Sequence, residues 1–420
     1  MRHNSIGAND KVILALIGAG GRGTRVILNM VEHNPDVEVK YLCEADDSKG
    51  GRAIDELNKL QGYKPMRVRD MQYVFDDKDV DAVVICTPEH WHALATIRAC
   101  QAGKDVYVEK NISLTIPEGR KMVEAAEKYG RIVQCGTQNR SAPYAYSARD
   151  YIQNGELGNI VTVKAYCLLP GGKPWFLKPD GSPPEGLNWD LWLGPAAKVS
   201  YNLSRHKAWY DWWAYSGGLA LAGDASHVMD LARLALGDPD HPESVYCTGG
   251  RILFDDQRDV PDMQVITYNY GNFVMTCESG VFGKTLSKSD SAIRYGDAFP
   301  KWDMNSTRIE IYGTRGLMYL GRHGGGWQVV GENGSIVAQE YGMFPDTMHQ
   351  VNFIESLRLR EQPKGNIEQG HRSAALVHLA NLSYRTGCNL LQFDAQSEMI
   401  TNSDEAMRLN AGNYREGFSI

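Results

Sequence analysis

The chain contains 420 residues, 43 % of them hydrophobic and 23 % charged, which is typical of a folded globular protein and excludes a disordered or collagen-like chain. Its 44 basic and 51 acidic residues give a net charge of −7 with no basic run, which argues against nucleic-acid binding. The length favours two domains, at least one of them large.

Cysteines and apolar runs indicate the compartment. The eight cysteines are scattered and form no C-x-x-C pair, so we expect buried free thiols, no disulfides and no metal site. No apolar run reaches about 18 residues, and no h-region precedes the first strand-like run, so we expect no membrane segment and no secretory signal. These features predict a cytoplasmic protein.

Residues 11 to about 137 alternate short apolar runs with helical patterns. The apolar runs are 12–17, 39–43, 82–86, 106–108 and 132–135, and the helix-like segments include 24–33, 49–60, 92–102 and 116–129. Strands that are apolar on both faces and alternate with helices are typical of a parallel, doubly wound α/β sheet. We therefore predict a first domain over residues 1–140.

A glycine-rich turn follows the first strand-like run. It matches G-x-G-x-x-G and consists of Gly18, Gly20, Gly21, Arg22 and Gly23. In such a turn the glycines bend the chain tightly, let the backbone approach a pyrophosphate and let the next helix pack on the sheet. Glu44, at the end of the second strand-like run, would accept hydrogen bonds from ribose hydroxyls. The alternative is a strand–helix turn that binds no ligand.

Acidic residues beside the expected ribose site bear on the choice of cofactor. Glu44 is followed by Asp46 and Asp47, which would repel a 2′-phosphate, so NAD is favoured over NADP. Arg22 would counter this if its guanidinium lay near the adenosine ribose.

Polar residues follow three of the first-domain strands, where an open α/β sheet binds its ligand. Lys110 interests us most, because burial can lower a lysine pKa enough for proton transfer near neutrality. The alternative is a lysine that only pairs with Glu109 or a cofactor phosphate. His90 and His92 are two residues apart and do not share a helix face, so a metal pair is not expected.

After about residue 140 the pattern changes. A helix at 143–154 and a strand at 160–168 precede a loop rich in Pro, Gly and Trp, and a helix follows near 224–236. The later strand-like runs are 245–254, 263–270, 272–279, 307–312, 316–320, 326–330 and 335–340, and helical patterns close the chain at 346–361 and 369–387. We predict an α+β domain over residues 141–420 with a mostly antiparallel sheet, whose last helix can pack back on the first domain.

Six of the nine tryptophans lie within residues 175–213. Tryptophan faces stack on sugars, and polar neighbours such as Arg205 and His206 would bind hydroxyls. Such residues also form ordinary core or subunit contacts. Both interpretations stay open.

The segment 217–230 combines glycines with acids and a histidine. If a helix begins at residue 224, then Asp224, His227 and Asp230 share one face, and a carboxylate beside the imidazole would make it a general base. Alternatively, Asp224 caps the helix and His227 is a buried, satisfied histidine.

Together these motifs resemble the Gfo/Idh/MocA family of NAD(P)-dependent oxidoreductases over residues 11 to about 393. The resemblance is carried by the glycine turn with Glu44, the strand end 86–92, the pair Glu109-Lys110, the segment 189–195 and the block 217–230. The family's proline after the lysine is Asn111 here, and its acid or amide four residues before the histidine is Gly223.

The resemblance implies a Rossmann domain followed by a large open-faced sheet, through which a homodimer or homotetramer would form. It also implies a sugar or cyclitol substrate, Lys110 as the catalytic lysine and His227 as the acid/base, with Asp224 as a further catalytic candidate. The predicted cofactor residues are those of the glycine turn with Glu44, Thr87, Pro88, His92, Glu109, Lys110 and Gln138. The predicted substrate residues are Trp91, Arg205, His206, Trp209, Asp224 and His227.

Three functions follow as hypotheses. The first is NAD-dependent dehydrogenation of a secondary hydroxyl on a sugar, glycoside or cyclitol. The second is redox-neutral glycoside cleavage through a transient keto-sugar. The third is a binding protein that regulates without turnover, which the presence of both Lys110 and His227 disfavours.

Overall fold

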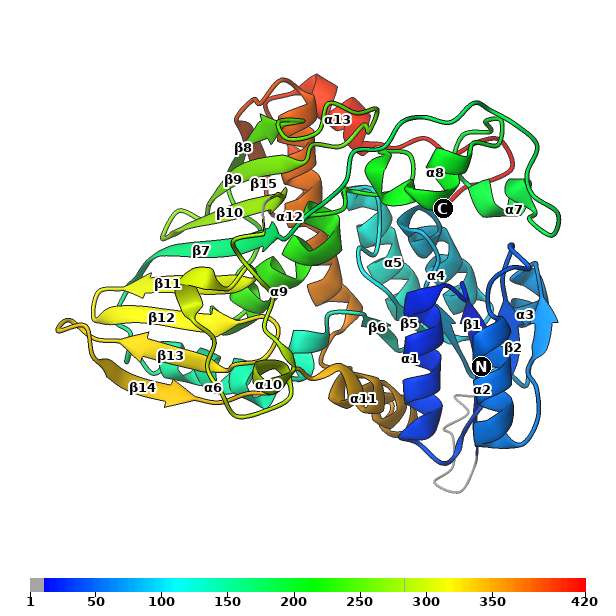
Figure 1. Ribbon diagram of the computed structural model, residues 1–420, viewed down its shortest axis with the longest axis horizontal. Helices are drawn as coiled ribbons and strands as arrows, with labels where there is room; N and C mark the ends of the chain where they lie inside the picture. Colours follow the sequence, from blue (N-terminus) through cyan, green and yellow to red (C-terminus); the bar gives the residue numbers. More distant parts are fainter. Residues whose placement is uncertain (1–10, 283) are drawn as a thin grey trace.

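The computed structural model describes residues 11–282 and 284–420, and these form two sheets with helices packed around them (Figure 1). The first is a six-stranded parallel sheet with the order β3-β2-β1-β4-β5-β6. Its strands are β1 (Val12–Ile17), β2 (Val37–Cys43), β3 (Met66–Val68), β4 (Ala82–Ile85), β5 (Asp105–Val108) and β6 (Val133–Cys135). Its helices are α1 (Gly21–Glu32), α2 (Gly51–Gln61), α3 (Gln72–Asp76), α4 (His92–Gln101) and α5 (Ile116–Tyr129). The predicted doubly wound sheet is confirmed.

The second sheet has ten strands in the order β14-β13-β12-β11-β7-β10-β9-β8-β15-β16. Only β7 and β10 pair in parallel, so the predicted mostly antiparallel sheet is confirmed. The strands are β7 (Ile160–Leu169), β8 (Ser244–Gly250), β9 (Met263–Asn269), β10 (Val274–Val281), β11 (Arg308–Gly313), β12 (Gly316–Gly321), β13 (Trp327–Val330), β14 (Ile336–Glu340), β15 (Leu391–Asp394) and β16 (Met399–Ile400). The helices are α6 (Pro143–Gln153), α7 (Trp189–Leu193), α8 (Leu203–Lys207), α9 (Ser226–Ala235), α10 (Ser291–Arg294), α11 (Asp346–Leu359), α12 (Ile367–Arg385) and α13 (Asp404–Asn410).

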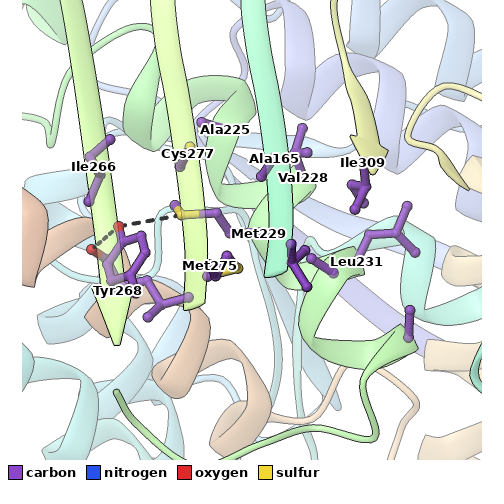
Figure 2. Packing of buried hydrophobic residues seen from close by; sticks show 14 of the residues in the cluster. Ala165, Ala225, Val228, Met229, Leu231, Ile266, Tyr268, Met275, Cys277 and Ile309 are labelled. Carbon is purple, nitrogen blue, oxygen red and sulfur yellow. Dashed lines mark hydrogen bonds between the residues drawn. The ribbon is translucent and has the colours of Figure 1, made fainter. Parts of the chain in front are cut away.

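One face of the large sheet packs on α9. Figure 2 shows side chains of β7, β9 and β10 directed toward Val228 and Met229 of that helix, and all of them are buried. The Tyr268 hydroxyl donates to the carbonyl oxygen of Leu376 at 2.8 Å, which satisfies a polar group inside this core. On the opposite face, residues such as Tyr246 and Val265 are exposed, in the alternation that a half-covered sheet requires.

Two late helices pack against the first domain. Phe353 and Leu357 of α11 lie in the same apolar core as Val26 and Met30 of α1. Helix α12 packs against α5 and β6 and also against α9 and β8. No helix of the described residues is both long enough and apolar enough to cross a bilayer.

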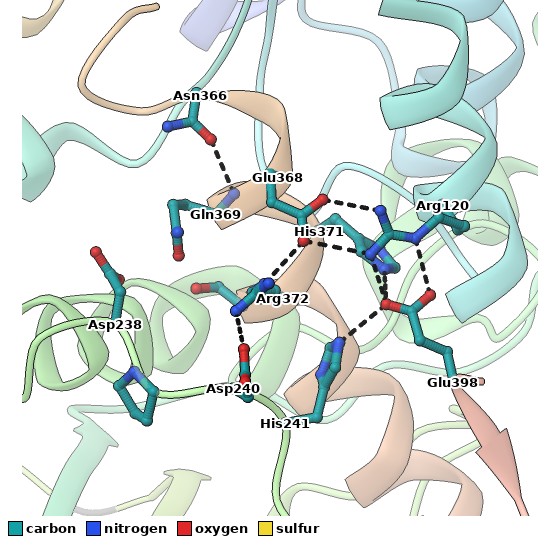
Figure 3. Close-up of polar contacts among 12 residues, drawn as sticks. Arg120, Asp238, Asp240, His241, Asn366, Glu368, Gln369, His371, Arg372 and Glu398 are labelled. Carbon is teal, nitrogen blue, oxygen red and sulfur yellow. Dashed lines mark hydrogen bonds and ion pairs between the residues drawn. The ribbon is translucent and has the colours of Figure 1, made fainter. Parts of the chain in front are cut away.

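A charged network joins α5 to α12 (Figure 3). Arg120 donates to both oxygens of Glu398, at 2.6 and 3.0 Å, and also pairs with Glu368 at 2.8 Å. The Nε2 atoms of His241 and His371 lie 3.0 and 2.8 Å from the same Glu398 oxygen. Burial opposes ionisation of Glu398, but the hydrogen bonds from His241, His371 and Arg120 hold its pKa below its usual range. Glu398 therefore acts as an ionised cross-link between segments distant in sequence.

Replacing Glu398 by Gln is expected to lower the free energy of unfolding at pH 7 by about 2 kcal/mol, because buried charge-assisted hydrogen bonds are lost. Since the folded-state pKa of Glu398 is depressed, its contribution is complete above about pH 4.5 and shrinks as the pH falls below that value. Urea denaturation at pH 7 and pH 4 should therefore show a smaller difference in the free energy of unfolding between the two proteins at pH 4. Asp303→Asn, which removes an exposed pair with Lys301, is the control and should change little.

Candidate active site

The turn between β1 and α1 has the geometry of a phosphate-binding loop. Gly18 has a φ of +90°, and a Cβ there would lie 2.7 Å from the backbone carbon of Cys86. A Cβ on Gly23 would lie 2.1 Å from the carbonyl oxygen of Gly18. At Gly20 and Gly21 no described atom beyond the turn itself lies within 4 Å of the ideal Cβ position. The open backbone N–H groups at the start of α1 therefore fit a dinucleotide pyrophosphate.

A cavity of about 470 Å³ opens beside this turn, large enough for part of a nucleotide. The predicted cofactor residues that line it are Gly18, Gly20, Gly21, Arg22, Glu44, Thr87 and Pro88. The opposite wall comes from α7 and α8, from Trp209 and, near the end of the chain, from Phe418. The cavity is therefore closed by segments far away in sequence from the glycine turn.

Glu44 is held against the glycine turn. One carboxylate oxygen accepts from the backbone N–H of Ala19 at 2.8 Å, and the other accepts from that of Asp46 at 3.1 Å. Burial raises the pKa of its carboxyl. Glu44 borders the cavity where a ribose hydroxyl can reach it.

Arg22 forms ion pairs with two carboxylates on the other side of the turn. Its Nε donates to Glu109 at 2.7 Å, and its Nη2 pairs with Asp346 of α11 at 3.1 Å. A guanidinium held between two carboxylates is not free to meet a 2′-phosphate beside Glu44. No sequence pattern indicated Asp346 as a partner of Arg22, because 324 residues separate the two.

Three residues predicted to bind substrate lie at the cavity of the glycine turn and not beside Lys110 and His227. Trp91, His206 and Trp209 line the cavity of the glycine turn, and among the described residues around that cavity neither Lys110 nor His227 occurs. The Trp91 indole donates to the carbonyl oxygen of Trp192 at 3.1 Å, which seats α7 on the first domain.

The tryptophan-rich loop forms mainly a small core of its own. Trp189 and Trp192 stack with centroids 4.6 Å apart, and both are buried together with Trp212. Arg205, also predicted to bind substrate, lies 3.9 Å above the Trp212 ring. Of the two interpretations of this loop, the structure favours core packing for these residues.

Lys110 lies at the carboxyl end of β5, where the sequence placed it. Its Nζ donates to the carbonyl oxygen of Ala222 at 3.3 Å, and Ser226 donates to the same oxygen at 2.8 Å. The Lys110–Asn111 peptide bond is cis. The hydrogen bond to Ala222 places the Lys110 ammonium near the start of α9, which begins one residue before His227.

Glu89 is a neighbour of Lys110 that is not among the predicted site residues. It is 3 % exposed, and its carboxylate accepts from the backbone N–H of Gly217 at 2.8 Å. Burial raises its pKa to about 7, an effect limited by the charge of Lys110. Its place in the strand end 86–92 was visible, but its approach to Gly217 depends on tertiary packing.

His92 and Gln138, both predicted to bind the cofactor, are buried behind the site. The ring nitrogens of His92 lie 2.6 Å from the carbonyl oxygen of Asn111 and 2.8 Å from that of Thr87. Gln138 is 2 % exposed and lies 3.5 Å from the Tyr107 hydroxyl. His92 thus fixes the backbone that carries Lys110, and neither residue borders the cavity.

His227 lies in the first turn of α9 and is 6 % exposed. Among the described residues its imidazole has no hydrogen-bond partner, which disfavours the alternative of a buried, satisfied histidine. Burial holds its pKa well below the usual value, and the charges of Arg322 and Lys110 add to this effect. The imidazole is therefore neutral at neutral pH and able to accept a proton.

Asp224 is not the carboxylate partner of His227, which corrects the prediction. The α-helix begins at Ser226, because Leu221–Ala225 form a π-helical turn, whose larger number of residues per turn shifts Asp224 out of register. Asp224 pairs instead with Lys288. Asp230 is also occupied, since it accepts from Arg140 at 2.7 Å.

Two further basic residues lower the pKa of His227. Arg322 and His323 follow β12, are 3 % and 4 % exposed, and contribute to the lowered pKa of His227. Nothing in the local sequence marked them, because they come from a strand end nearly 100 residues after the histidine.

Three family models match the chain. Residues 12–137 match "Oxidoreductase family, NAD-binding Rossmann fold". Residues 195–319 match "GFO/IDH/MocA C-terminal domain", and residues 330–420 match "Oxidoreductase family, C-terminal alpha/beta domain".

Individual proteins agree with these models. The chain is 28 % identical to scyllo-inositol 2-dehydrogenase (NAD(+)) of Bacillus subtilis over 74 % of each chain. It is 33 % identical to a glycosyl hydrolase family 109 protein of Shewanella baltica, but only over 28 % of this chain and 27 % of the other. The WlbA dehydrogenase of Bordetella pertussis, solved with NADH and UDP-GlcNAcA, shares the fold with a TM-score of 0.64 and 19 % identity over 92 % of this chain and 98 % of that one.

Proposed function

The chain belongs to the Gfo/Idh/MocA oxidoreductase family and has its NAD-binding domain, and from this we propose that it oxidises a secondary hydroxyl of a sugar, glycoside or cyclitol with NAD. The observation that carries the proposal is the position of Lys110 near His227. Lys110 donates to the carbonyl oxygen of Ala222, which lies five residues before His227, and the neutral imidazole of His227 has no hydrogen-bond partner among the described residues.

The roles follow from the charges. His227 accepts the hydroxyl proton, since burial and nearby cations keep its imidazole neutral. Lys110 donates a hydrogen bond to the same oxygen and stabilises it as carbonyl character develops. The bound nicotinamide supplies the hydride acceptor. The glycine turn and Glu44 would hold the pyrophosphate and the adenosine ribose.

NAD is proposed over NADP because Glu44 borders the ribose position and Arg22 is committed to Glu109 and Asp346. The assignment of Trp91, His206 and Trp209 to the cofactor site belongs to the same proposal.

The test is an incubation of the purified protein with NAD or NADP and a panel of sugars, glycosides and cyclitols. We expect net NADH with at least one panel member and a higher kcat/KM with NAD than with NADP. Glycoside cleavage without net NADH would instead support redox-neutral cleavage. Nucleotide binding without turnover of any panel member would contradict the proposal and support a binding protein.

A further inference from the structure

Two guanidinium groups near the acid/base lack acceptors. Arg322 is 3 % exposed, and its Nε and Nη1 atoms are buried without a hydrogen-bond partner. The Nε of Arg294, at the end of α10, is in the same condition. Within the described ranges 11–282 and 284–420, neither arginine has a carboxylate oxygen within 4.0 Å, although buried arginines are normally paired.

The chain brings these two arginines together through a glycine loop after β12. Gly324 has a φ of +78°, and a Cβ there would lie 2.9 Å from the Cα of Arg294, so the two segments touch only because this residue is glycine. The Phe344 backbone N–H donates to the carbonyl oxygen of Arg294 at 2.8 Å. The guanidinium carbons lie 4.3 Å (Arg294) and 4.8 Å (Arg322) from the centroid of the Phe344 ring.

The surroundings do not neutralise this pair of cations. The Phe344 ring attracts a guanidinium face but does not accept its in-plane N–H groups. The acids whose charges reach Arg322 are committed elsewhere, Asp224 to Lys288 and Asp346 to Arg22. Two like charges share one ring, and an uncompensated buried charge is costly. The arrangement is that of an anion-binding site.

This site adjoins the proposed chemistry. Of all charges acting on His227, that of Arg322 is the strongest, ahead of Lys110. The charge of Arg322 also lowers the pKa of Asp224, which lies three residues before His227. An anion bound by Arg322 would therefore lie near the imidazole of His227.

We propose that the substrate is an acidic sugar or cyclitol whose carboxylate or phosphate binds Arg322 and Arg294. The inference rests on the proposed function and narrows its substrate class. A neutral polyol would leave the N–H groups of both arginines unpaired, whereas an anion supplies charge-assisted hydrogen bonds to them.

Matched neutral and anionic compounds test the proposal: glucose, glucuronate and glucose 6-phosphate, and myo-inositol with its monophosphate. Oxidation with NAD is measured together with calorimetric binding to the cofactor-free protein. We expect an anionic member to bind at least about tenfold tighter than its neutral counterpart. Comparing glucuronate with glucose 6-phosphate separates a carboxylate site from a phosphate site.

Arg322→Met should abolish this preference, a loss of about 10- to 100-fold in affinity for the anionic member. Because it removes an unpaired buried charge, Tm should stay the same or rise, whereas a merely structural arginine would lower Tm when replaced. Added inorganic phosphate should raise the Tm of the wild type more than that of Arg322→Met. Arg315→Met, which replaces an exposed arginine before β12, should behave as the wild type.

The outcomes distinguish the acidic-substrate inference from the proposed function. Oxidation confined to neutral members, or a preference unchanged in Arg322→Met, overturns the acidic-substrate inference and leaves the proposed function intact. Absence of oxidation with every panel member and either nucleotide overturns the proposed function itself.

Discussion

Replacing Lys110 by Met is expected to lower kcat for substrate oxidation by about 10³-fold, the loss typical of removing a donor to a developing oxyanion together with proton-transfer assistance. The Lys110 ammonium lies at the end of β5 and already donates to the carbonyl oxygen of Ala222 at 3.3 Å, so a substrate oxygen can take over that hydrogen bond. The affinity for NAD should change by less than about threefold, because Lys110 does not line the cavity beside the glycine turn.

Steady-state rates, with NAD affinity from tryptophan fluorescence, check this expectation. Lys128→Met, which replaces an exposed lysine at the end of α5, is the matched control and should retain full activity. Lys110→Arg should not restore the rate, because the guanidinium differs from an ammonium in shape and remains charged. A kcat within about tenfold of the wild type in Lys110→Met would remove Lys110 from the chemistry.

Glu89 shows why the position of Lys110, the proposed catalytic lysine, could be predicted from the sequence but its surroundings could not. Strand ends follow from apolar runs, and the runs before Lys110 and Glu89 are short and clear. That the buried carboxylate of Glu89 accepts from Gly217 depends on how the second domain packs on the first, 128 residues later. The alternation of strands and helices therefore predicted the sheet and the edge at which its strands end. It did not predict which residues of the second domain contact that edge.

Dependence on tertiary packing and local helix geometry also explains why the predicted pairing of Asp224 with His227 was wrong. Spacing of three residues predicts a shared face only on a regular α-helix, and Leu221–Ala225 form a π-helical turn instead. The pairing of Arg22 with Asp346 and the clustering of Arg322 with Arg294 likewise involve segments without local sequence signals. For the tryptophan loop, composition permitted two interpretations, and only the stacking of Trp189 on Trp192 distinguished them.

Replacing His227 by Asn is expected to lower kcat by about 10²- to 10⁴-fold, the range for loss of a general base. His227 has no competing hydrogen-bond partner among the described residues, so its lone pair is free for the substrate proton. Binding of NAD should persist, since His227 does not border the cofactor cavity. His33→Asn, at an exposed histidine after α1, is the control and should leave kcat unchanged.

The pH dependence gives His227 a second, independent test. Burial, Arg322 and Lys110 depress the folded-state pKa of His227 below about 6.5, so the wild-type rate should hold through neutral pH and fall only at more acidic values. The unfolded chain binds this proton more readily, so stability declines as the pH falls below about 6.5, and His227→Asn should lose less stability over that range. Arg322→Met removes the strongest cation acting on the imidazole and should move the acid limb of kcat toward higher pH. An acid limb unchanged in both variants would mean that another group accepts the proton.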